Sequence, residues 1–148
     1  MIPIAFNTSV TDLAPVPAIV ETMQRQSFSY SAILNSDNEL RAFLGSMMKP
    51  HGDFDEAHVK HVVRLWEALK KFYAGKLPLP LAQSTSEGNI QLAWDLGQFY
   101  LEIEVRRDFG LEWFYRDRVT NDLDGTEDEP DFALSNSLIS RLWCICRP

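Results

Sequence analysis

Three histidines fall close together in a stretch that also carries aspartates. His51, His58 and His61 could supply the nitrogen ligands that zinc prefers, and a catalytic zinc ion needs three protein ligands. His58 and His61 are three residues apart, so they share one face if the segment is helical. No glutamate lies between them where a metalloprotease base would be. The alternative is a polar helix face opposite the apolar positions Val59 and Val62.

Two cysteines, Cys144 and Cys146, are separated by one residue near the C-terminus. They resemble a metal or redox pair only loosely, because no second pair accompanies them. Two cysteines are also too few for a disulfide scaffold. We interpret them as small apolar residues in a packing segment, with free thiols.

Acidic side chains form two further patterns. Residues 120–131 resemble a calcium-loop frame with Gly125 at its central turn, but the frame lacks the terminal bidentate glutamate, which favours a solvated loop. Glu102 and Glu104 alternate on a predicted strand and could serve acid–base hydrolysis. The same spacing is typical of any strand with one solvated face, so no catalytic residue is assigned. The calcium ligands would be Thr120, Asp122, Asp124, Asp128 and Asp131.

Two helices precede the acidic strand in the chain. Ser36 and Glu39 have capping-box spacing ahead of an apolar pattern that reaches Met47, which predicts a helix there. Residues 53–74 show the clearest helical pattern, with acidic residues in the first turn and lysines in the last. The apolar stripe of this helix comprises Val59, Val62, Val63, Trp66, Leu69, Phe72 and Tyr73.

The first thirty residues give weaker patterns. Apolar residues alternate at Ile2, Ile4 and Phe6, which is typical of an extended arm or an edge strand. Residues 17–26 could form a short helix with a proline in its first turn, and residues 27–30 could be extended.

Residues 89–118 predict an antiparallel β-meander of three strands. The strands are expected at Ile90–Asp95, Phe99–Arg106 and Leu111–Arg118, with turns between them. The aromatic run in the third strand leaves its inward face open between Trp113/Tyr115 and Phe114/Arg116. The residues expected in the core are Ile90, Leu92, Trp94, Leu101, Ile103 and Val105.

The other face of the middle strand carries Tyr100, Glu102, Glu104 and Arg106. Alternation predicts that this row is exposed to solvent. Tyrosine and tryptophan are favoured anchors of protein interfaces, and Tyr100 is part of this row. We therefore take the row as the first candidate surface for a protein partner.

These elements together predict a single α+β domain over residues 1–148, with N-terminal helices packed on a C-terminal antiparallel β-meander. A helix from about Ser135 to Cys144 is expected in the last segment. The predicted divisions are a helical part at about 15–75, a connector at 76–88, the β-meander at 89–118, an acidic loop at 119–131 and a C-terminal packing segment at 132–148.

Composition restricts the classes of partner. The net charge is −7 and the pI about 4.9, and the basic residues are scattered, which argues against duplex DNA or an anionic membrane as the partner. No apolar run approaches the roughly 20 residues that span a bilayer. Residues 1–13 lack the pattern of a signal peptide. We expect a cytoplasmic, bacterial protein that needs no cofactor.

The β-hairpin segment resembles small uncharacterised bacterial proteins, which typically have Gly-Gly-x-Gln-Leu-x-Trp, then Leu-Glu-Ile-Glu, then an aromatic strand. Asn89 stands here in place of the second glycine. The resemblance covers about a quarter of the chain and implies a bacterial cytoplasmic α+β accessory protein. It transfers no catalytic residue. The matching segments are Gly88-Asn89-Ile90-Gln91-Leu92-Ala93-Trp94, Leu101-Glu102-Ile103-Glu104-Val105 and Trp113-Phe114-Tyr115.

Three hypotheses of function follow. The leading one is a non-enzymatic protein-interaction module, an accessory protein of antitoxin, immunity or phage-defence type, with homo-oligomerisation left open. The second is a metal-dependent enzyme or metal-regulated module that uses His51, His58 and His61. The third is an acidic inhibitor that mimics nucleic acid through residues 120–131 together with Glu102 and Glu104.

Overall fold

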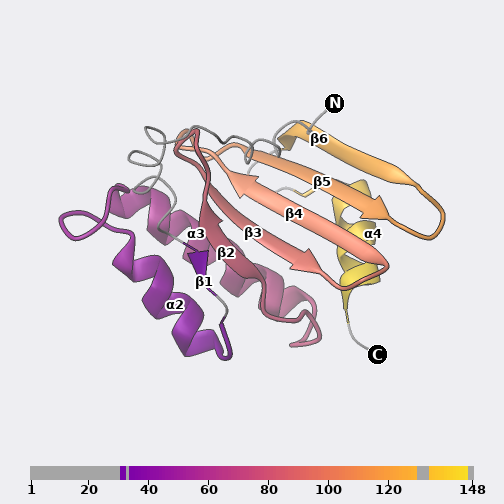
Figure 1. Ribbon diagram of the computed structural model, residues 1–148, viewed down its shortest axis with the longest axis horizontal. Coiled ribbons are helices and arrows are strands. Elements are labelled where there is room, and N and C mark those ends of the chain that lie inside the picture. Colours follow the sequence, from indigo (N-terminus) through magenta and orange to yellow (C-terminus); the bar gives the residue numbers. More distant parts are fainter. Residues whose placement is uncertain (1–30, 33, 130–133, 147–148) are drawn as a thin grey trace, which may run out of the picture.

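The computed structural model describes residues 31–32, 34–129 and 134–146 of the chain. Within these residues the chain forms three helices and one six-stranded antiparallel sheet, so the predicted α+β class is confirmed. The strands lie side by side in chain order, from β1 to β6 (Figure 1). The arm expected at residues 2–6, the short helix at residues 17–26 and the extended segment at residues 27–30 lie outside the described residues.

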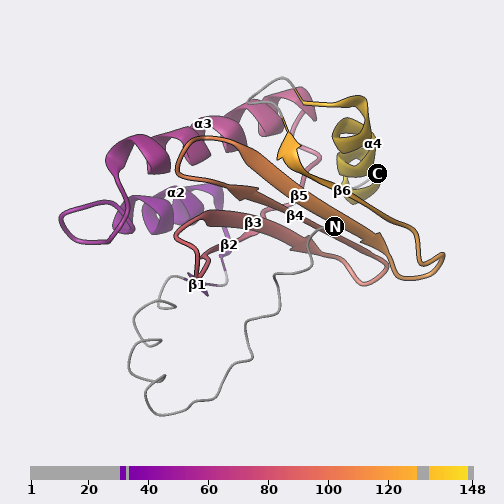
Figure 2. The ribbon, with the colours of Figure 1, turned by 90° about the horizontal axis from the view of Figure 1, so that it is seen from above.

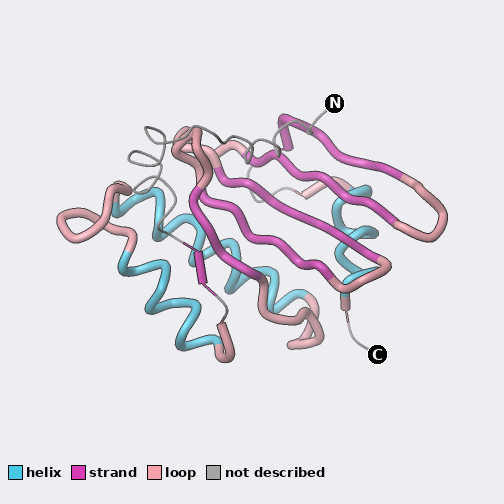
Figure 3. The backbone as a smooth tube through the Cα atoms, viewed as in Figure 1, coloured by secondary structure: helices cyan, strands magenta, loops and turns pink. Residues whose placement is uncertain are grey.

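Helices and strands are separated in the chain as well as in space (Figure 3). Two helices precede most of the sheet, and the third follows it. The helices are α2 (Asp37–Ser46), α3 (Glu56–Phe72) and α4 (Asn136–Ile145). The strands are β1 (Ser31–Ala32), β2 (Leu81–Ser84), β3 (Ile90–Asp95), β4 (Phe99–Val105), β5 (Leu111–Asp117) and β6 (Leu123–Glu129).

The predicted meander is confirmed as strands β3, β4 and β5, with ends within one residue of those expected. The structure also resolves the inward face of β5. Leu111, Trp113 and Tyr115 are buried, whereas Phe114 is half-buried and Arg116 is exposed. The aromatic run on β5 is therefore divided between the two faces of the sheet.

Three strands, β1, β2 and β6, were not predicted. β2 lies in the segment expected to be a connector, where Ala82 pairs with Leu92 and is fully buried. β6 lies in the segment expected to be an acidic loop, so that prediction is wrong. β2 is too short to show alternation, and the composition of β6 is almost entirely polar. Both are stabilised by backbone pairing with a strong neighbouring strand, and charges are common on an edge strand such as β6.

Helix α2 begins with the predicted cap. The Ser36 hydroxyl accepts a hydrogen bond from the Glu39 backbone N–H at 3.1 Å. Glu39 reaches back as expected, but its carboxylate accepts from the Asn35 N–H at 2.9 Å rather than from Ser36. These bonds satisfy donors that the helix itself leaves unpaired, which fixes where the helix starts.

Helix α3 begins at Glu56, three residues later than predicted. The preceding residues are held in a loop by two backbone bonds, from Lys49 N–H to Phe54 O at 2.9 Å and from Phe54 N–H to Met47 O at 2.9 Å. Most of the predicted stripe is buried, but Phe72 is exposed. The stripe positions confirmed in the core are Val59, Val62, Trp66, Leu69 and Tyr73.

Helix α4 confirms the helix expected near the C-terminus. The Ser135 hydroxyl caps it by accepting from the Leu138 N–H at 3.2 Å. Its inward residues Leu138, Leu142 and Ile145 are fully buried.

The core lies between the helices and one face of the sheet. Helices α3 and α4 cover that face, and α2 packs beside α3 (Figure 2). The opposite face carries no helix among the described residues. No helix in the described part of the chain is long and apolar enough to cross a membrane. The predicted core residues of β3 and β4 are all buried: Ile90, Leu92, Trp94, Leu101, Ile103 and Val105.

Candidate functional site

The row predicted to be exposed on β4 lies on the sheet face opposite the helices, but its centre is buried. Glu102 and Glu104 keep only 7% and 4% of their surface exposed, while Tyr100 and Arg106 at the ends are half-buried. The predicted exposure is therefore wrong for both glutamates. Asn89, Gln91 and Tyr100 donate hydrogen bonds to the two carboxylates, and strand alternation alone does not reveal these contacts.

Glu102 is held by hydrogen bonds on both carboxylate oxygens. Gln91 Nε2 donates to Glu102 Oε1 at 3.1 Å, and the Tyr100 hydroxyl donates to Glu102 Oε2. Gln91 in turn accepts from Gln83 Nε2 at 2.6 Å. Burial raises the pKa of Glu102, although the bond from Tyr100 opposes this effect. The result is a continuous polar chain across strands β2, β3 and β4.

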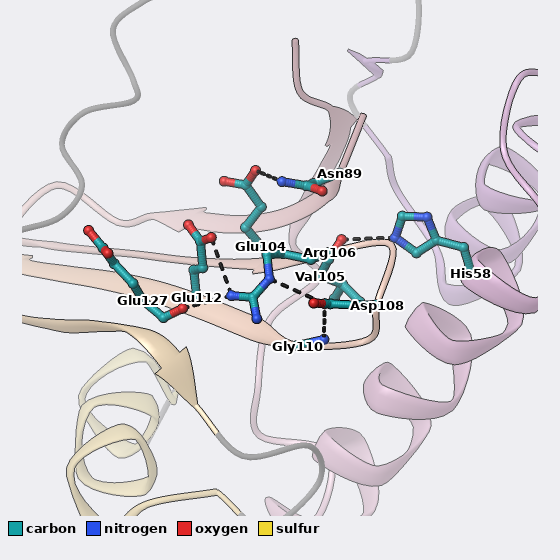
Figure 4. Close-up of polar contacts among 9 residues, drawn as sticks. All are labelled: His58, Asn89, Glu104, Val105, Arg106, Asp108, Gly110, Glu112 and Glu127. Carbon is teal, nitrogen blue, oxygen red and sulfur yellow. Dashed lines mark hydrogen bonds and ion pairs between the residues drawn. The ribbon is translucent and has the colours of Figure 1, made fainter. Parts of the chain in front are cut away.

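Glu104 lies beside this chain and faces a second carboxylate. Asn89 Nδ2 donates to Glu104 Oε2 at 2.7 Å (Figure 4). Glu112 on β5 is the cross-strand neighbour of Glu104. Burial raises the pKa of Glu104 to about 7, and the nearby charges of Glu112 and Glu102 add to the shift. This carboxyl group therefore exchanges a proton close to neutral pH.

Arg106 ties the end of the row to the neighbouring turn and strand. Its guanidinium donates to Asp108 Oδ1 at 3.2 Å, to Glu112 Oε2 at 3.4 Å and to the Glu127 carbonyl at 2.7 Å (Figure 4). Asp108 also accepts from the Gly110 N–H at 2.9 Å. Arg106 thus joins β4 to β6 across β5. The polar face is a rigid internal network that can bind protons, and its central glutamates are not available for direct contact with a partner.

The structure separates the three histidines. His51 is exposed, whereas His58 and His61 are buried and not on a polar helix face. His58 Nε2 lies 2.8 Å from the Val105 carbonyl, and the His61 ring stacks on Phe109 at 4.5 Å between centroids. Both rings fix α3 to the end of β4 and the following turn. No group of His, Cys, Asp and Glu in the described part of the chain could hold a metal ion.

The other candidate metal ligands are also placed in structural roles. Cys144 and Cys146 are free thiols, both half-buried against the core. The calcium-loop frame at residues 120–131 is wrong, because residues 123–129 are extended in β6 and Asp131 lies outside the described residues. Asp124 accepts a hydrogen bond from Arg141 Nε at 3.0 Å, which fixes β6 to α4.

An aromatic surface lies where the end of α3 meets α4. Tyr73 is fully buried there, and its hydroxyl donates to the Ile139 carbonyl at 3.0 Å. The rings of Phe72 and Trp143 contact it edge to face, at 4.8 Å and 4.7 Å between centroids. Phe72 is 58% exposed and Trp143 is 49% exposed. We call Phe72, Tyr73 and Trp143 the aromatic surface.

The prediction from sequence placed Phe72 in the core stripe and Trp143 in a packing segment. Phe72 points about 100° away from Tyr73, and Tyr73 is fully buried, so Phe72 falls toward the edge of the buried stripe. The exposure of Phe72 could therefore have been predicted from its angular position on the helix. The exposure of Trp143 follows from the same periodicity, since its neighbour Leu142 is fully buried.

Comparison of the chain with protein-family models, with curated proteins and with solved structures found no match.

Proposed function

We propose that this chain is a protein-interaction module that binds a partner protein through the aromatic surface. The observation that supports this is the exposure of two large aromatic side chains, Phe72 and Trp143, on either side of the buried Tyr73. Tryptophan and tyrosine dominate the energetically important positions of protein interfaces, and aromatic residues are enriched there.

The rigidity of the surface supports the same function. Tyr73 is fixed by its hydrogen bond to the Ile139 carbonyl, so the end of α3 and the middle of α4 are joined beneath the exposed rings. A partner that covers Phe72 and Trp143 would bury apolar area without first having to order the binding site. An accessory role of the antitoxin, immunity or phage-defence kind is a biological setting that such a module would serve.

The test is a pull-down of the tagged chain from the organism that encodes it. We expect the wild-type chain to recover a stoichiometric protein partner, and the Phe72→Ser/Trp143→Ser double variant to recover at least tenfold less. Both side chains are about half exposed, so the variant should keep the fold, which a circular dichroism spectrum checks.

The matched control is the Val119→Ser/Leu123→Ser double variant. These two side chains are even more exposed than the aromatic pair but lie around the turn between β5 and β6. It should recover the partner as the wild type does. Equal recovery by all three chains, or a wild-type chain that always elutes alone, would show the proposal to be wrong.

A further inference from the structure

Helix α3 carries a line of basic side chains on its outer face. Lys60, Arg64 and Lys71 are all exposed. The spacing of four and seven residues places them on one side of the helix, because two helical turns take about seven residues. This line stands out in a chain whose net charge is −7. We call these three residues, together with Lys76 just beyond the helix, the basic ridge.

The basic ridge leads into the aromatic surface. Lys71 immediately precedes Phe72 in the chain. The Lys76 backbone N–H donates to the Tyr73 carbonyl at 3.0 Å. The cationic residues Lys71 and Lys76 therefore come immediately before and shortly after the exposed Phe72.

Most of the ridge is not neutralised within the protein. Lys60 pairs with Glu56 on the same helix. Among the described residues, Arg64, Lys71 and Lys76 have no ion-pair partner. By contrast, Lys70 lies one position away from the ridge and is already bound to Asp37 at 3.0 Å. Glu67 lies on the same face between Arg64 and Lys71, but its carboxylate already pairs with Arg41 and Lys70. The ridge thus presents positive charge that a binding partner could complement.

We propose that the basic ridge and the aromatic surface together receive an acidic segment of the partner protein. The segment lies along α3, with acidic side chains toward the ridge and apolar side chains against Phe72 and Trp143. From Lys60 to Phe72 the helix rises about 18 Å, which a partner helix of about twelve residues would match. This inference rests on the proposed function and adds the chemistry of the partner.

Two properties favour a protein segment over a nucleic acid. A nucleic acid carries phosphates along its whole length, so it would extend past the ridge onto the acidic surface of a chain whose net charge is −7. A short acidic segment experiences the local positive charge of the ridge more strongly, because ions screen charges beyond about 10 Å at ordinary salt concentrations. The apolar part of the surface also suits side chains that a protein supplies.

The experiment begins with a photo-reactive benzoylphenylalanine in place of Ala68. This residue is exposed on α3 between Arg64 and Lys71. Cross-linking in the native organism and mass spectrometry identify the segment that lies on the helix. We expect an acidic peptide that also contains apolar residues. A cross-link to nucleic acid, to a second copy of this chain or to a peptide without net negative charge would overturn the inference.

The identified peptide is then synthesised and its affinity measured by fluorescence anisotropy. We expect Arg64→Glu to weaken binding at least tenfold. The control Arg116→Glu makes the same charge change at an exposed position on β5 and should change binding less than twofold. Raising the salt concentration should weaken binding of the wild type more than that of Arg64→Glu.

The two proposals fail in different ways. If Arg64→Glu binds like the wild type while Phe72→Ser/Trp143→Ser loses binding, the partner uses the aromatic surface without the basic ridge, and only the inference about acidity is overturned. If Phe72→Ser/Trp143→Ser binds like the wild type, the proposed function itself is wrong.

Discussion

At the scale of single residues, two carboxyl groups are buried, and burial of an ionised carboxylate lowers the stability of the folded protein. Glu102 and Glu104 are nearly inaccessible, and burial raises the pKa of both. Arg106, two residues beyond Glu104, donates to Asp108 and Glu112. Alternation placed both glutamates on the correct face of the sheet. Their burial could not be predicted from this alternation, because it depends on contacts with side chains of neighbouring strands.

Glu104→Gln should change how stability depends on pH. The folded-state pKa of Glu104 is about 7, above the usual 4.5, so the folded protein binds the proton more tightly than the unfolded chain does. The contribution of protonated Glu104 to the free energy of unfolding is present below pH 4.5 and is lost as the pH rises through 7. Glutamine mimics the protonated form, so the variant should gain on the order of 2 to 3 kcal/mol relative to wild type above pH 7.

Urea denaturation of wild type and variant at several pH values between 4 and 8 measures this difference. The two chains should be equally stable near pH 4.5 and diverge as the pH rises. A constant difference across the range would show that folding does not shift the pKa of Glu104.

At the scale of elements, the strength of local signals decided what could be predicted. Helices α2 and α4 have serine caps, all three helices have apolar faces, and β3 to β5 alternate clearly, so their existence and most of their ends were predicted. β2 and β6 lack such signals because pairing with a neighbour, not their own composition, makes them strands. The aromatic surface combines residues from α3 and α4, and sequence spacing does not show that these helices meet.

Replacement of glycine by alanine should lower the free energy of unfolding at one position and raise it at another. A Cβ at Gly125 on β6 would lie 2.5 Å from the Trp113 carbonyl oxygen, which is backbone and cannot move aside easily. A Cβ at Gly45 near the end of α2 meets nothing within 4 Å. Gly125→Ala should therefore lower the free energy of unfolding by about 1 to 3 kcal/mol. Gly45→Ala should raise it by up to about 1 kcal/mol.

Thermal unfolding followed by circular dichroism compares the two variants with the wild type. Hydrogen exchange adds a local measurement, because β6 should lose protection in Gly125→Ala more than β3 does. If Gly125→Ala were as stable as the wild type, the close approach of β6 to β5 would not be as described.

At the scale of the whole molecule, two titrating groups act in opposite directions near one end of β4. His58 lies on the helical side of the sheet and Glu104 on the other side (Figure 4). Burial lowers the pKa of His58, and Arg107 and His61 add to this shift, while the bond to Val105 opposes it. Protonation of His58 in acid therefore destabilises the packing of α3 on the sheet. Protonation of Glu104 in acid instead stabilises the folded protein.

His58→Gln should make the protein less sensitive to acid. The folded-state pKa of His58 lies below the usual 6.5, so its contribution to stability is present above that value and is lost as the pH falls through the folded-state pKa. The glutamine amide keeps a donor for the Val105 carbonyl but does not titrate. The free energy of unfolding of the variant should fall less than that of the wild type between pH 7 and 5. A larger fall in the variant would contradict this assignment.

The chain order of the sheet has a consequence for how the protein is made. Because β1 to β6 lie side by side in the order of synthesis, each strand after β2 can pair as soon as it leaves the ribosome. Helix α4 comes after all of them and brings Leu138, Leu142 and Ile145 into the core. A nascent chain that has completed its sheet therefore still exposes an apolar face, and folding ends only when α4 closes it.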